Sequence, residues 1–505
     1  MVLKILAAAY EYFPKDYTVH VATGLIGVLA TYRIAQGRKT TRERDLHARV
    51  VVLTGAFTPL GLTLLEQLAK RGAHVIALTP HSVADERVST FIDLLRSTTS
   101  NENIYAEECD LASPPSIQAF AARFVKGTNP GPGPGAGPNL DPPRVDALVF
   151  AHEYAAVGAW GAFSAPEAAR AAEQLQRDEG ALGTFLLMTL LLPALLTAPV
   201  ERDIRIVNMV NRFYAAAAPR MFKDATYAFE DLYSTKTKAK STALQASPIP
   251  REATRALRTI ILTRHLQRVL DALPSAPVPN PLENPADAPP PTHVQKSNIV
   301  AVSVSPGLSR AETVAPLFGL PSGSRWGWLF YVLLYPLLLL FAKSSSASIQ
   351  SVLHVLFLPT PIKVRSLSFP CSSRMIKAKA KTPLDQEPEE ALKPGALYAE
   401  CSVVRLDVAI AAPPSSSASS ETSPTPSSET TPTPSEKGNA NGKEKAKDEL
   451  TEIPDDGELG GEAGGRAVWE AYEAGLRVWE AAYPTPATSS AGNPVGNAGA
   501  GAGMS

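Results

Sequence analysis

The chain has 505 residues, 45 of them proline, and 48 basic residues against 49 acidic ones give a formal net charge of −1. This near-neutral balance argues against a nucleic-acid partner, because such partners are held largely by basic contacts to phosphate. Three cysteines are too few and too scattered for a disulfide framework or a zinc site. We therefore expect no nucleic-acid partner and a reduced compartment, and the length allows two or three average domains.

The first 45 residues contain an apolar, helix-length stretch over residues 19–35. It is short for a membrane span, which needs about 20 apolar residues, and it includes His20 and Arg33. Four basic residues follow it: Arg38, Lys39, Arg42 and Arg44. Two interpretations stay open, a membrane anchor with the basic cluster on the cytosolic side or a helix that packs on the domain.

Residues 49–78 predict a buried strand, a glycine-bearing turn, a helix and a second buried strand. Residues 50–53 are all apolar and three of them are β-branched, which is typical of a parallel strand covered on both faces. Helical spacing of apolar residues follows, at Leu60, Leu64, Leu65 and Leu68. The turn therefore lies at the carboxyl end of the first strand, where doubly wound sheets bind ligands.

That turn reads TGAFTPLG, from Thr54 to Gly61. It resembles the TGxxxGxG turn of the short-chain dehydrogenase/reductase superfamily, with Pro59 where the middle glycine is expected. The resemblance implies that NAD or NADP places its pyrophosphate on free N–H groups at the helix N-terminus. Proline offers no N–H but fits the first helical turn. A purely structural turn is the alternative. The implied cofactor contacts are Thr54, Gly55, Phe57, Thr58, Leu60 and Gly61.

The second and third strands end in further features of this family. Residues 104–109 predict the third strand, and the Asp110-Leu111 pair after it implies a contact to the adenine ring. An Asx turn that caps the next helix is a compatible alternative. After the second strand the chain reads Thr79-Pro80-His81, where an acidic residue would hold the ribose of NAD. This absence favours NADP or leaves the choice between NADP and NAD open.

The fourth strand, predicted over residues 145–151, leads into a departure from the family pattern. The NNAG signature is replaced by Phe150, Ala151, His152 and Glu153, and Ala151 is the implied cofactor contact. His152 and Glu153 could form an acid–base pair, but local hydrogen bonding is more typical of neighbours in such a loop. A long helix over residues 167–196 resembles the family's central interface helix, and a homodimer stays open.

The proton-transfer residues of the family have no exact counterpart. The fifth strand, residues 203–210, ends at Asn211, where the family places its catalytic serine; an amide can still donate a hydrogen bond to a substrate carbonyl. The family's tyrosine and lysine lie four apart on one helix face. Tyr233 and Lys236, three apart, are the nearest approximation. They are either a shifted pair or charged residues of a surface loop before a helix that starts at Pro250.

Residues 299–304 predict the sixth strand, followed by Ser305-Pro306-Gly307 and Thr313. This segment is similar to the family's Pro-Gly turn beside the nicotinamide, which implies cofactor contacts by Pro306 and Gly307. The matches together predict an α/β fold, a doubly wound parallel sheet of Rossmann type over residues 46–410. Pro/Gly-rich insertions interrupt it at 127–143 and 274–296.

An apolar segment, residues 325–343, follows that turn where the family keeps a lid over the substrate. As a surface lid it would exceed the apolar patches that soluble proteins tolerate. We expect a membrane-embedded or interfacial segment at the pocket mouth; a buried helix or a dimer contact are the alternatives.

The C-terminal part is expected to be a disordered linker over residues 411–465, rich in Ser, Thr, Pro and Glu. Residues 466–484 predict an amphipathic helix that docks on the domain, binds a partner or lies on a membrane. A second disordered tail, 485–505, completes the chain.

The chain thus resembles a divergent, membrane-associated, fungal-type member of the superfamily with degenerate catalytic motifs. The resemblance implies an NAD(P)(H)-dependent oxidoreductase for the carbonyl or hydroxyl of a hydrophobic, lipid-like small molecule. We expect it on a membrane facing the cytosol, the endoplasmic reticulum or another lipid-rich membrane. The alternative is a non-catalytic protein on the same fold, serving as a cofactor-binding or scaffold protein.

Overall fold

The computed structural model describes residues 18–126, 144–155, 158–163, 166–198, 202–218, 248–273, 298–361, 390–406 and 456–483. Both Pro/Gly-rich insertions, the segment with Tyr233 and Lys236, and residues 484–505 lie outside the described residues. The linker predicted over 411–465 ends earlier than expected, because residues 456–465 are described and a helix begins at Gly461.

Eight strands form one sheet in the order β3-β2-β1-β4-β5-β6-β7-β8, and only the β7–β8 pair is antiparallel. The strands are β1 (Val50–Thr54), β2 (His74–Thr79), β3 (Ile104–Glu108), β4 (Ala147–Phe150), β5 (Ile204–Met209), β6 (Ile299–Ser305), β7 (Leu397–Ala399) and β8 (Ser402–Val404). β1 pairs in parallel with both β2 and β4. The strand order therefore reverses between β1 and β4, which is where such sheets bind ligands. The predicted doubly wound sheet is confirmed.

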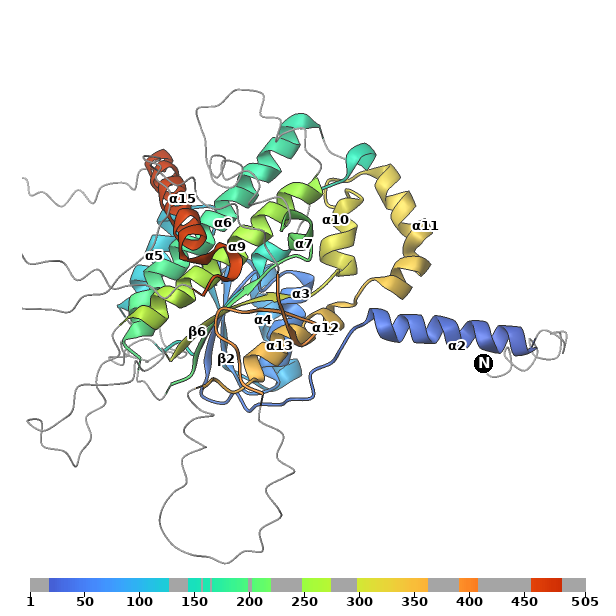
Figure 1. The fold of residues 1–505 in the computed structure, drawn as a ribbon, viewed down its shortest axis with the longest axis horizontal. Helices are drawn as coiled ribbons and strands as arrows, with labels where there is room; N and C mark the ends of the chain where they lie inside the picture. The colour runs from blue at the N-terminus through green and yellow to red at the C-terminus, as the bar shows by residue number, and fades with distance from the viewer. Residues whose placement is uncertain are drawn as a thin grey trace, which may run out of the picture.

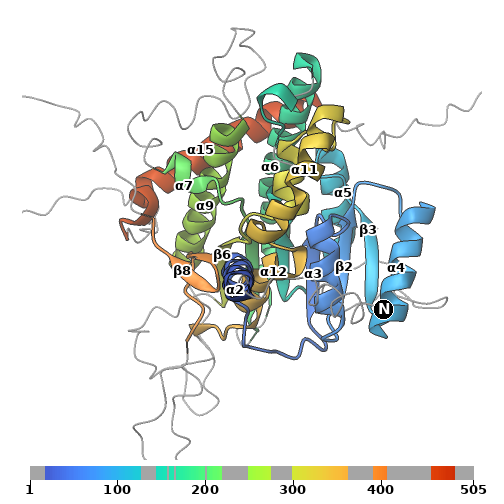
Figure 2. The same cartoon turned by 90° about the vertical axis from the view of Figure 1, so that its right-hand side faces the viewer.

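Helices cover both faces of this sheet (Figures 1 and 2). One face carries α3 (Pro59–Ala69), α4 (Glu86–Thr99), α12 (Ser345–Ser348) and α13 (Gln350–Phe357); the other carries α5 (Pro114–Val125), α6 (Glu167–Leu196) and α9 (Pro248–Ala272). Alternate residues of β1 feed the two cores, with Leu53 facing α3 and Val52 facing the α5 side. Because both faces are buried, the central strands are apolar on both sides.

Side chains near the helix starts explain the observed boundaries. Thr58 caps α3 by accepting from the Gly61 N–H at 3.1 Å, and Pro59 occupies the first helical position. The sequence predicts a helix over residues 82–95, but Asp85 caps α4 by accepting the Arg87 N–H at 3.0 Å, so that helix begins at Glu86 and ends at Thr99. α6 has its predicted bounds, whereas α9 begins two residues before the predicted Pro250.

The C-terminal helix α15 (Gly461–Ala482) docks back onto the domain, which decides between the three alternatives left open by the sequence. It packs against α9 and α6, as Figure 1 shows in red. Val468, Tyr472 and Trp479 are buried along its inner side. The apolar stripe therefore belongs to the core of this chain.

Two further apolar helices lie outside the core. α2 (Thr18–Ala35) projects from the body, and α11 (Arg325–Phe341) crosses the same side (Figure 1). Only Gly327 of α11 is buried, so the alternative of a buried helix is wrong. Among the described residues, one helix is long and apolar enough to cross a membrane, residues 169–196, and 61% of it is buried inside the protein. α2 and α11 are shorter apolar helices.

Candidate functional site

The glycine turn lies at the carboxyl end of β1 and is built around two close approaches. Gly55 has φ 64°, a conformation that favours glycine, and a Cβ there would lie 2.8 Å from the His152 backbone nitrogen. A Cβ on Gly61 would lie 2.0 Å from the Gly55 carbonyl oxygen. Larger residues would push α3 away from β1. The turn therefore has the tight geometry that the family resemblance implies.

The N–H groups at the start of α3 are already occupied, contrary to the expectation of free donors. Leu60 donates its N–H to the Glu312 carboxylate, with 2.5 Å between the nitrogen and Oε1. Gly61 donates to the Thr58 hydroxyl, and Leu62 donates to the Thr58 carbonyl. Since Pro59 has no backbone N–H, the first helical turn offers no unoccupied N–H group. In this conformation the turn does not fit a cofactor pyrophosphate, because a side chain of the protein occupies that position.

The Pro-Gly turn after β6 is engaged in the same way. Tyr154 is fully buried, and its hydroxyl donates to the Gly307 carbonyl at 2.9 Å. The same oxygen accepts from the Ser309 N–H at 3.1 Å and from the Thr313 hydroxyl at 3.2 Å. Burial raises the pKa of Tyr154 above its ordinary value, so the phenol stays protonated. Tyr154 thus ties the segment expected beside the nicotinamide to the exit of β4.

Thr54 and Ala151 lie side by side at the ends of β1 and β4. The Thr54 hydroxyl accepts from the Ala151 N–H at 3.2 Å and lies 2.8 Å from Nδ1 of His152. His152 Nε2 is 3.2 Å from the Gly180 carbonyl oxygen and 3.0 Å from the Thr184 hydroxyl. Burial lowers the pKa of His152, so its ring stays neutral at pH 7. The ring fastens β1, β4 and α6 together.

Glu153 is hydrogen-bonded to α6 and α9, which are distant in the chain, so the expected local hydrogen bonding is wrong for this residue, and it forms no acid–base dyad with His152. Its Oε1 accepts from Thr184 at 2.6 Å and its Oε2 accepts from Thr259 at 2.9 Å. Asp110 is used locally, because its carboxylate accepts the Ala112 N–H at 3.0 Å in an Asx turn before α5. Leu111 is half-buried, and its carbonyl lies so close to α6 that a Cβ on Gly183 would come within 2.2 Å of it.

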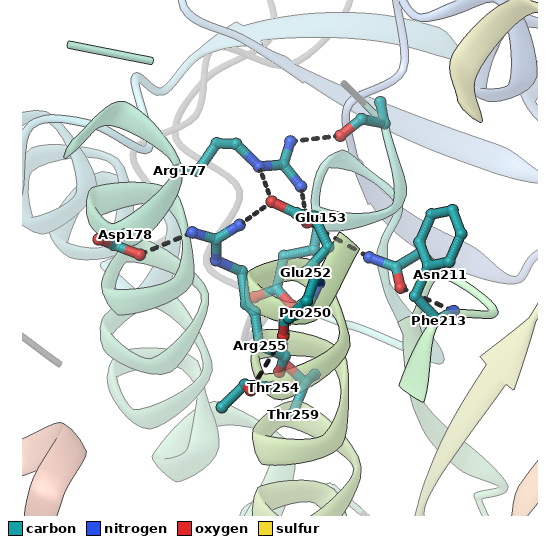
Figure 3. A network of polar contacts seen from close by, with 11 residues as sticks. Glu153, Arg177, Asp178, Asn211, Phe213, Pro250, Glu252, Thr254, Arg255 and Thr259 are labelled. Atoms are coloured by element: carbon teal, nitrogen blue, oxygen red, sulfur yellow. Dashed lines mark hydrogen bonds and ion pairs between the residues drawn. The ribbon is translucent and has the colours of Figure 1, made fainter. Parts of the chain in front are cut away.

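Asn211, at the end of β5, faces a buried cluster of charges (Figure 3). Its amide donates to Glu252 Oε2 at 3.3 Å, and its Oδ1 accepts the Phe213 N–H at 3.1 Å. Glu252 lies on the first turns of α9 and is paired with Arg177 of α6 and with Arg255. Arg255 also reaches Asp178 at 2.7 Å. The amide that was expected to contact a substrate is therefore engaged by the protein.

The charge state of Glu252 follows from its neighbours. Burial alone would raise its pKa, but Arg177 and Arg255 outweigh burial and hold the pKa below the ordinary value. Glu252 is thus ionised at neutral pH and has no proton to donate. The cluster fixes Asn211 in place and does not by itself provide an acid.

Tyr233 and Lys236 lie outside the described residues, and their position is not part of this geometry. The segment that carries them joins two described helices, α7 (Tyr214–Ala217) and α9, which pack against each other. Among the described residues that flank this segment, Glu252 of α9 contacts Asn211.

The structure brings together the residues at the ends of β1, β4 and β6 and places Asn211 at the next strand end. Sequence reasoning missed three side chains of this edge: Tyr154, Glu252 and Glu312. Glu252 stands directly before Ala253, the first apolar residue of the predicted helix pattern, and nothing in that pattern reveals its partner. The partners of Glu312 and Glu252 lie 252 and 41 positions away in the chain.

Comparisons with known proteins agree with this architecture. A family model described as KR domain matches residues 49–130. The uncharacterized oxidoreductase YNL181W of Saccharomyces cerevisiae is 28% identical over 340 residues, which cover 66% of this chain and 74% of that protein. The uncharacterized oxidoreductase pbr1 of Schizosaccharomyces pombe is 25% identical over 364 residues, 69% of this chain and 81% of that protein.

A solved short-chain dehydrogenase from Sphingobium yanoikuyae, in complex with NADPH, is similar over 60% of this chain and 82% of its own, with 16% identity and a TM-score of 0.35. The family model begins at residue 49, directly before β1, and each of the two fungal relatives matches about two thirds of this chain. The chain is similar to these two fungal oxidoreductases, and its sheet is a Rossmann-like parallel sheet of the short-chain dehydrogenase/reductase type.

Proposed function

We propose that this protein is a membrane-associated oxidoreductase that uses NAD(P)(H) on the carbonyl or hydroxyl group of a hydrophobic small molecule. The observation that carries the proposal is α11. This helix begins at Arg325, after the loop that starts at Pro306-Gly307 and two short helical turns, and its apolar side chains are exposed along its length. An apolar surface beside the carboxyl edge of the sheet suits a substrate that arrives from a lipid phase.

α2 strengthens the membrane part of the proposal. It packs against α11, and Gln36 at its end bonds to both the Ala342 carbonyl and the Ser344 N–H. Val19, Ile26 and Ile34 on α2 are mostly exposed. The two helices thus present one continuous apolar side, which is larger than a soluble protein usually exposes.

The basic residues after α2 divide into two groups. Arg38 and Lys39 are exposed next to the apolar side, where they suit the anionic headgroups of a cytosolic leaflet. Arg44 instead turns inward and pairs with Asp203 at 2.9 Å. We therefore place the membrane on the α2 and α11 side, with the sheet in the cytosol.

A groove of about 720 Å³ opens at the start of α11. Its lining is mostly apolar, and consists of Leu320, Gly323, Ser324, Arg325, Trp326, Trp328 and Leu329. This volume is in the range of small-molecule sites. It is a candidate entry for the hydrophobic substrate.

Turnover of a panel of sterol, acyl and retinoid carbonyls tests the enzymatic part, with NADPH or NADH oxidation as the readout in lipid vesicles. We expect turnover, and we expect Tyr233→Phe to abolish it because the proton donor is lost. Tyr227→Phe is the matched control, because it removes the hydroxyl of another tyrosine in the same segment, and this variant should keep activity. Unchanged turnover in Tyr233→Phe would refute this proton donor.

One specific observation favours a second candidate, a non-catalytic protein on the same fold. Asn211 and Glu252 are bonded to each other and to Arg177 and Arg255, and the described residues provide no acid at this place. A protein that binds NADPH or NADH but turns over no carbonyl in the panel would support this candidate over the enzyme. A protein that binds neither nucleotide would remove both.

A further inference from the structure

Glu312 stands on the N-terminus of α3, where the family resemblance expects a phosphate. It comes from η4 (Arg310–Val314), the short helical turn after β6, and 252 residues separate it from Leu60. It is only 4% exposed. One carboxylate oxygen accepts the Leu60 N–H, whereas the other, Oε2, has no hydrogen-bond partner among the described residues. The buried Glu312 carboxyl group therefore lies at the start of α3 with a hydrogen bond to only one of its two oxygens.

A carboxylate at this position imitates a phosphate oxygen. The N-terminus of an α-helix carries a partial positive charge and N–H groups that favour an anion. α3 is 11 residues long, and its start faces the switch point between β1 and β4. Glu312 supplies an acceptor oxygen from within the chain, so that the start of α3 is capped without a ligand.

Other polar atoms near Glu312 lack partners as well. The hydroxyl oxygens of Ser305 and Ser309 are buried without a hydrogen-bond partner among the described residues. Ser305 is the last residue of β6, and Ser309 directly precedes η4. Buried polar groups are normally satisfied, so these two hydroxyls, on the segment that leads to Glu312, are further polar groups that the described residues leave unpaired.

The loop that carries Glu312 is fastened by two sets of contacts. Tyr154 holds Gly307 and Ser309. The neighbouring Arg310 donates its N–H to the Lys343 carbonyl, and the Lys343 side chain pairs with Glu400 at 2.5 Å. Lys343 lies just after α11, so movement of η4 would displace the residues at the end of this apolar helix.

We propose that Glu312 occupies the phosphate subsite of this crevice, and that a pyrophosphate-bearing nucleotide binds only by displacing its carboxylate from the Leu60 N–H. This inference rests on the proposed function for the identity of the nucleotide. The subsite itself rests on the contacts of α3 and η4 alone. Displacement costs free energy, so the intact chain binds nucleotide more weakly than a chain without the carboxylate.

The test measures NADH and ADP binding to the full-length protein in lipid nanodiscs by calorimetry. Glu312→Ala removes the carboxylate and should bind both ligands about tenfold or more tightly than the wild type, as expected when a competing closed state is removed. Glu312→Gln keeps an acceptor for Leu60 without the charge and should fall in between. Glu66→Gln, an exposed acid on the same helix, is the control and should match the wild type.

The outcomes separate this inference from the proposed function. Equal affinity of wild type and Glu312→Ala would overturn the inference while leaving the oxidoreductase intact. Tighter ADP binding by Glu312→Ala, with no carbonyl turnover in any variant, would support the inference and count against the enzyme. If no variant binds NADH or ADP while circular dichroism shows intact folding, the subsite does not exist and the inference fails.

Discussion

The two large apolar surfaces of this molecule differ in what covers them. The outer side of α6 and α9 is covered by α15, which returns from the end of the chain and buries Trp479 completely. The side formed by α2 and α11 has no such cover among the described residues, and Trp326 and Leu333 are 70% and 73% exposed. The described residues therefore supply a partner for one apolar surface and leave the other exposed.

The polar crevice belongs with the covered surface. Glu312 caps α3, Tyr154 occupies the Pro-Gly turn, and Glu252 engages Asn211. Each of these contacts satisfies a group that a ligand would otherwise meet. On our proposals, a cofactor would compete with the protein's own side chains for its site, whereas a lipid surface would meet α2 and α11 without such competition.

The largest expected effect concerns the uncovered surface. Replacing Trp326, Leu333 and Phe341 with glutamate should reduce vesicle partitioning of the full-length protein by about 1000-fold or more, because burying each such side chain contributes about 1.5–3 kcal/mol. Flotation with liposomes that contain anionic lipid measures this. The free energy of unfolding should change by less than about 0.5 kcal/mol per substitution, since all three side chains are exposed.

Two exposed apolar residues of α4 provide the matched control. Phe91 and Leu94 are 43% and 56% exposed, and α4 covers β3 at the far edge of the sheet. Phe91→Glu with Leu94→Glu should leave partitioning unchanged. Two results would contradict this contrast between α11 and α4. One is an equal loss of vesicle partitioning in the α11 and α4 variants, and the other is a wild type that stays fully soluble in the presence of vesicles.

A smaller effect is expected at the covered surface. Trp479→Ala should cost about 3–5 kcal/mol of the free energy of unfolding, because it leaves a cavity between α15 and the α6–α9 pair. Urea unfolding followed by circular dichroism measures the loss. Val478→Ala, at the neighbouring exposed position, should cost less than about 0.5 kcal/mol. A Trp479→Ala cost below about 1 kcal/mol would show that α15 is not part of the core.

The smallest expected effect is the pH dependence of NADH affinity at the polar crevice. Burial raises the pKa of the Glu312 carboxyl from its ordinary value of 4.5 to about 7, although the Leu60 N–H and the Thr58 side chain oppose the rise. The closed crevice thus holds its proton more tightly than a displaced, solvated Glu312 would. Between pH 4.5 and 7, falling pH favours the closed crevice, so NADH affinity should weaken by up to about tenfold per pH unit and level off above pH 7.

NADH is the appropriate probe because it lacks the titrating phosphate of NADPH. Two ionisable residues lie near Glu312. Tyr154 has a pKa raised above its ordinary value of 10, so it stays protonated over the tested range, and Arg310 lies on the same helical turn. The first turn of α3 and all of α12 carry no ionisable side chain. The pH dependence should disappear in Glu312→Gln; an identical slope in that variant would assign it to another group.

Much of the fold could be predicted because its signals are local. The bounds of α6 follow from composition, and β1 and α3 follow from an apolar run, a glycine turn and helical spacing. Errors arose where one side chain overrides the pattern, as where Asp85 delays the start of α4. The exposure of α11 was expected from the excess of apolar residues in one segment.

The contents of the site could not be predicted, because they depend on contacts between distant segments. The sequence indicated Thr313 as a family match, but nothing in it showed that the neighbouring Glu312 reaches Leu60. Glu252 falls in the first turns of a helix whose apolar residues alone were recognised. Tyr154 lies one residue beyond the altered NNAG segment and looks like a core aromatic until its hydroxyl partners are known.

Amide hydrogen exchange at Leu60 tests the central claim most directly, since this N–H has no acceptor within its own helix and reports on Glu312 alone. Without nucleotide, the Leu60 amide should exchange slowly in the wild type and rapidly in Glu312→Ala, and NADH should slow it again in the variant. Rapid exchange at the same rate in both proteins would contradict the account, because the carboxylate would then not cover the start of α3.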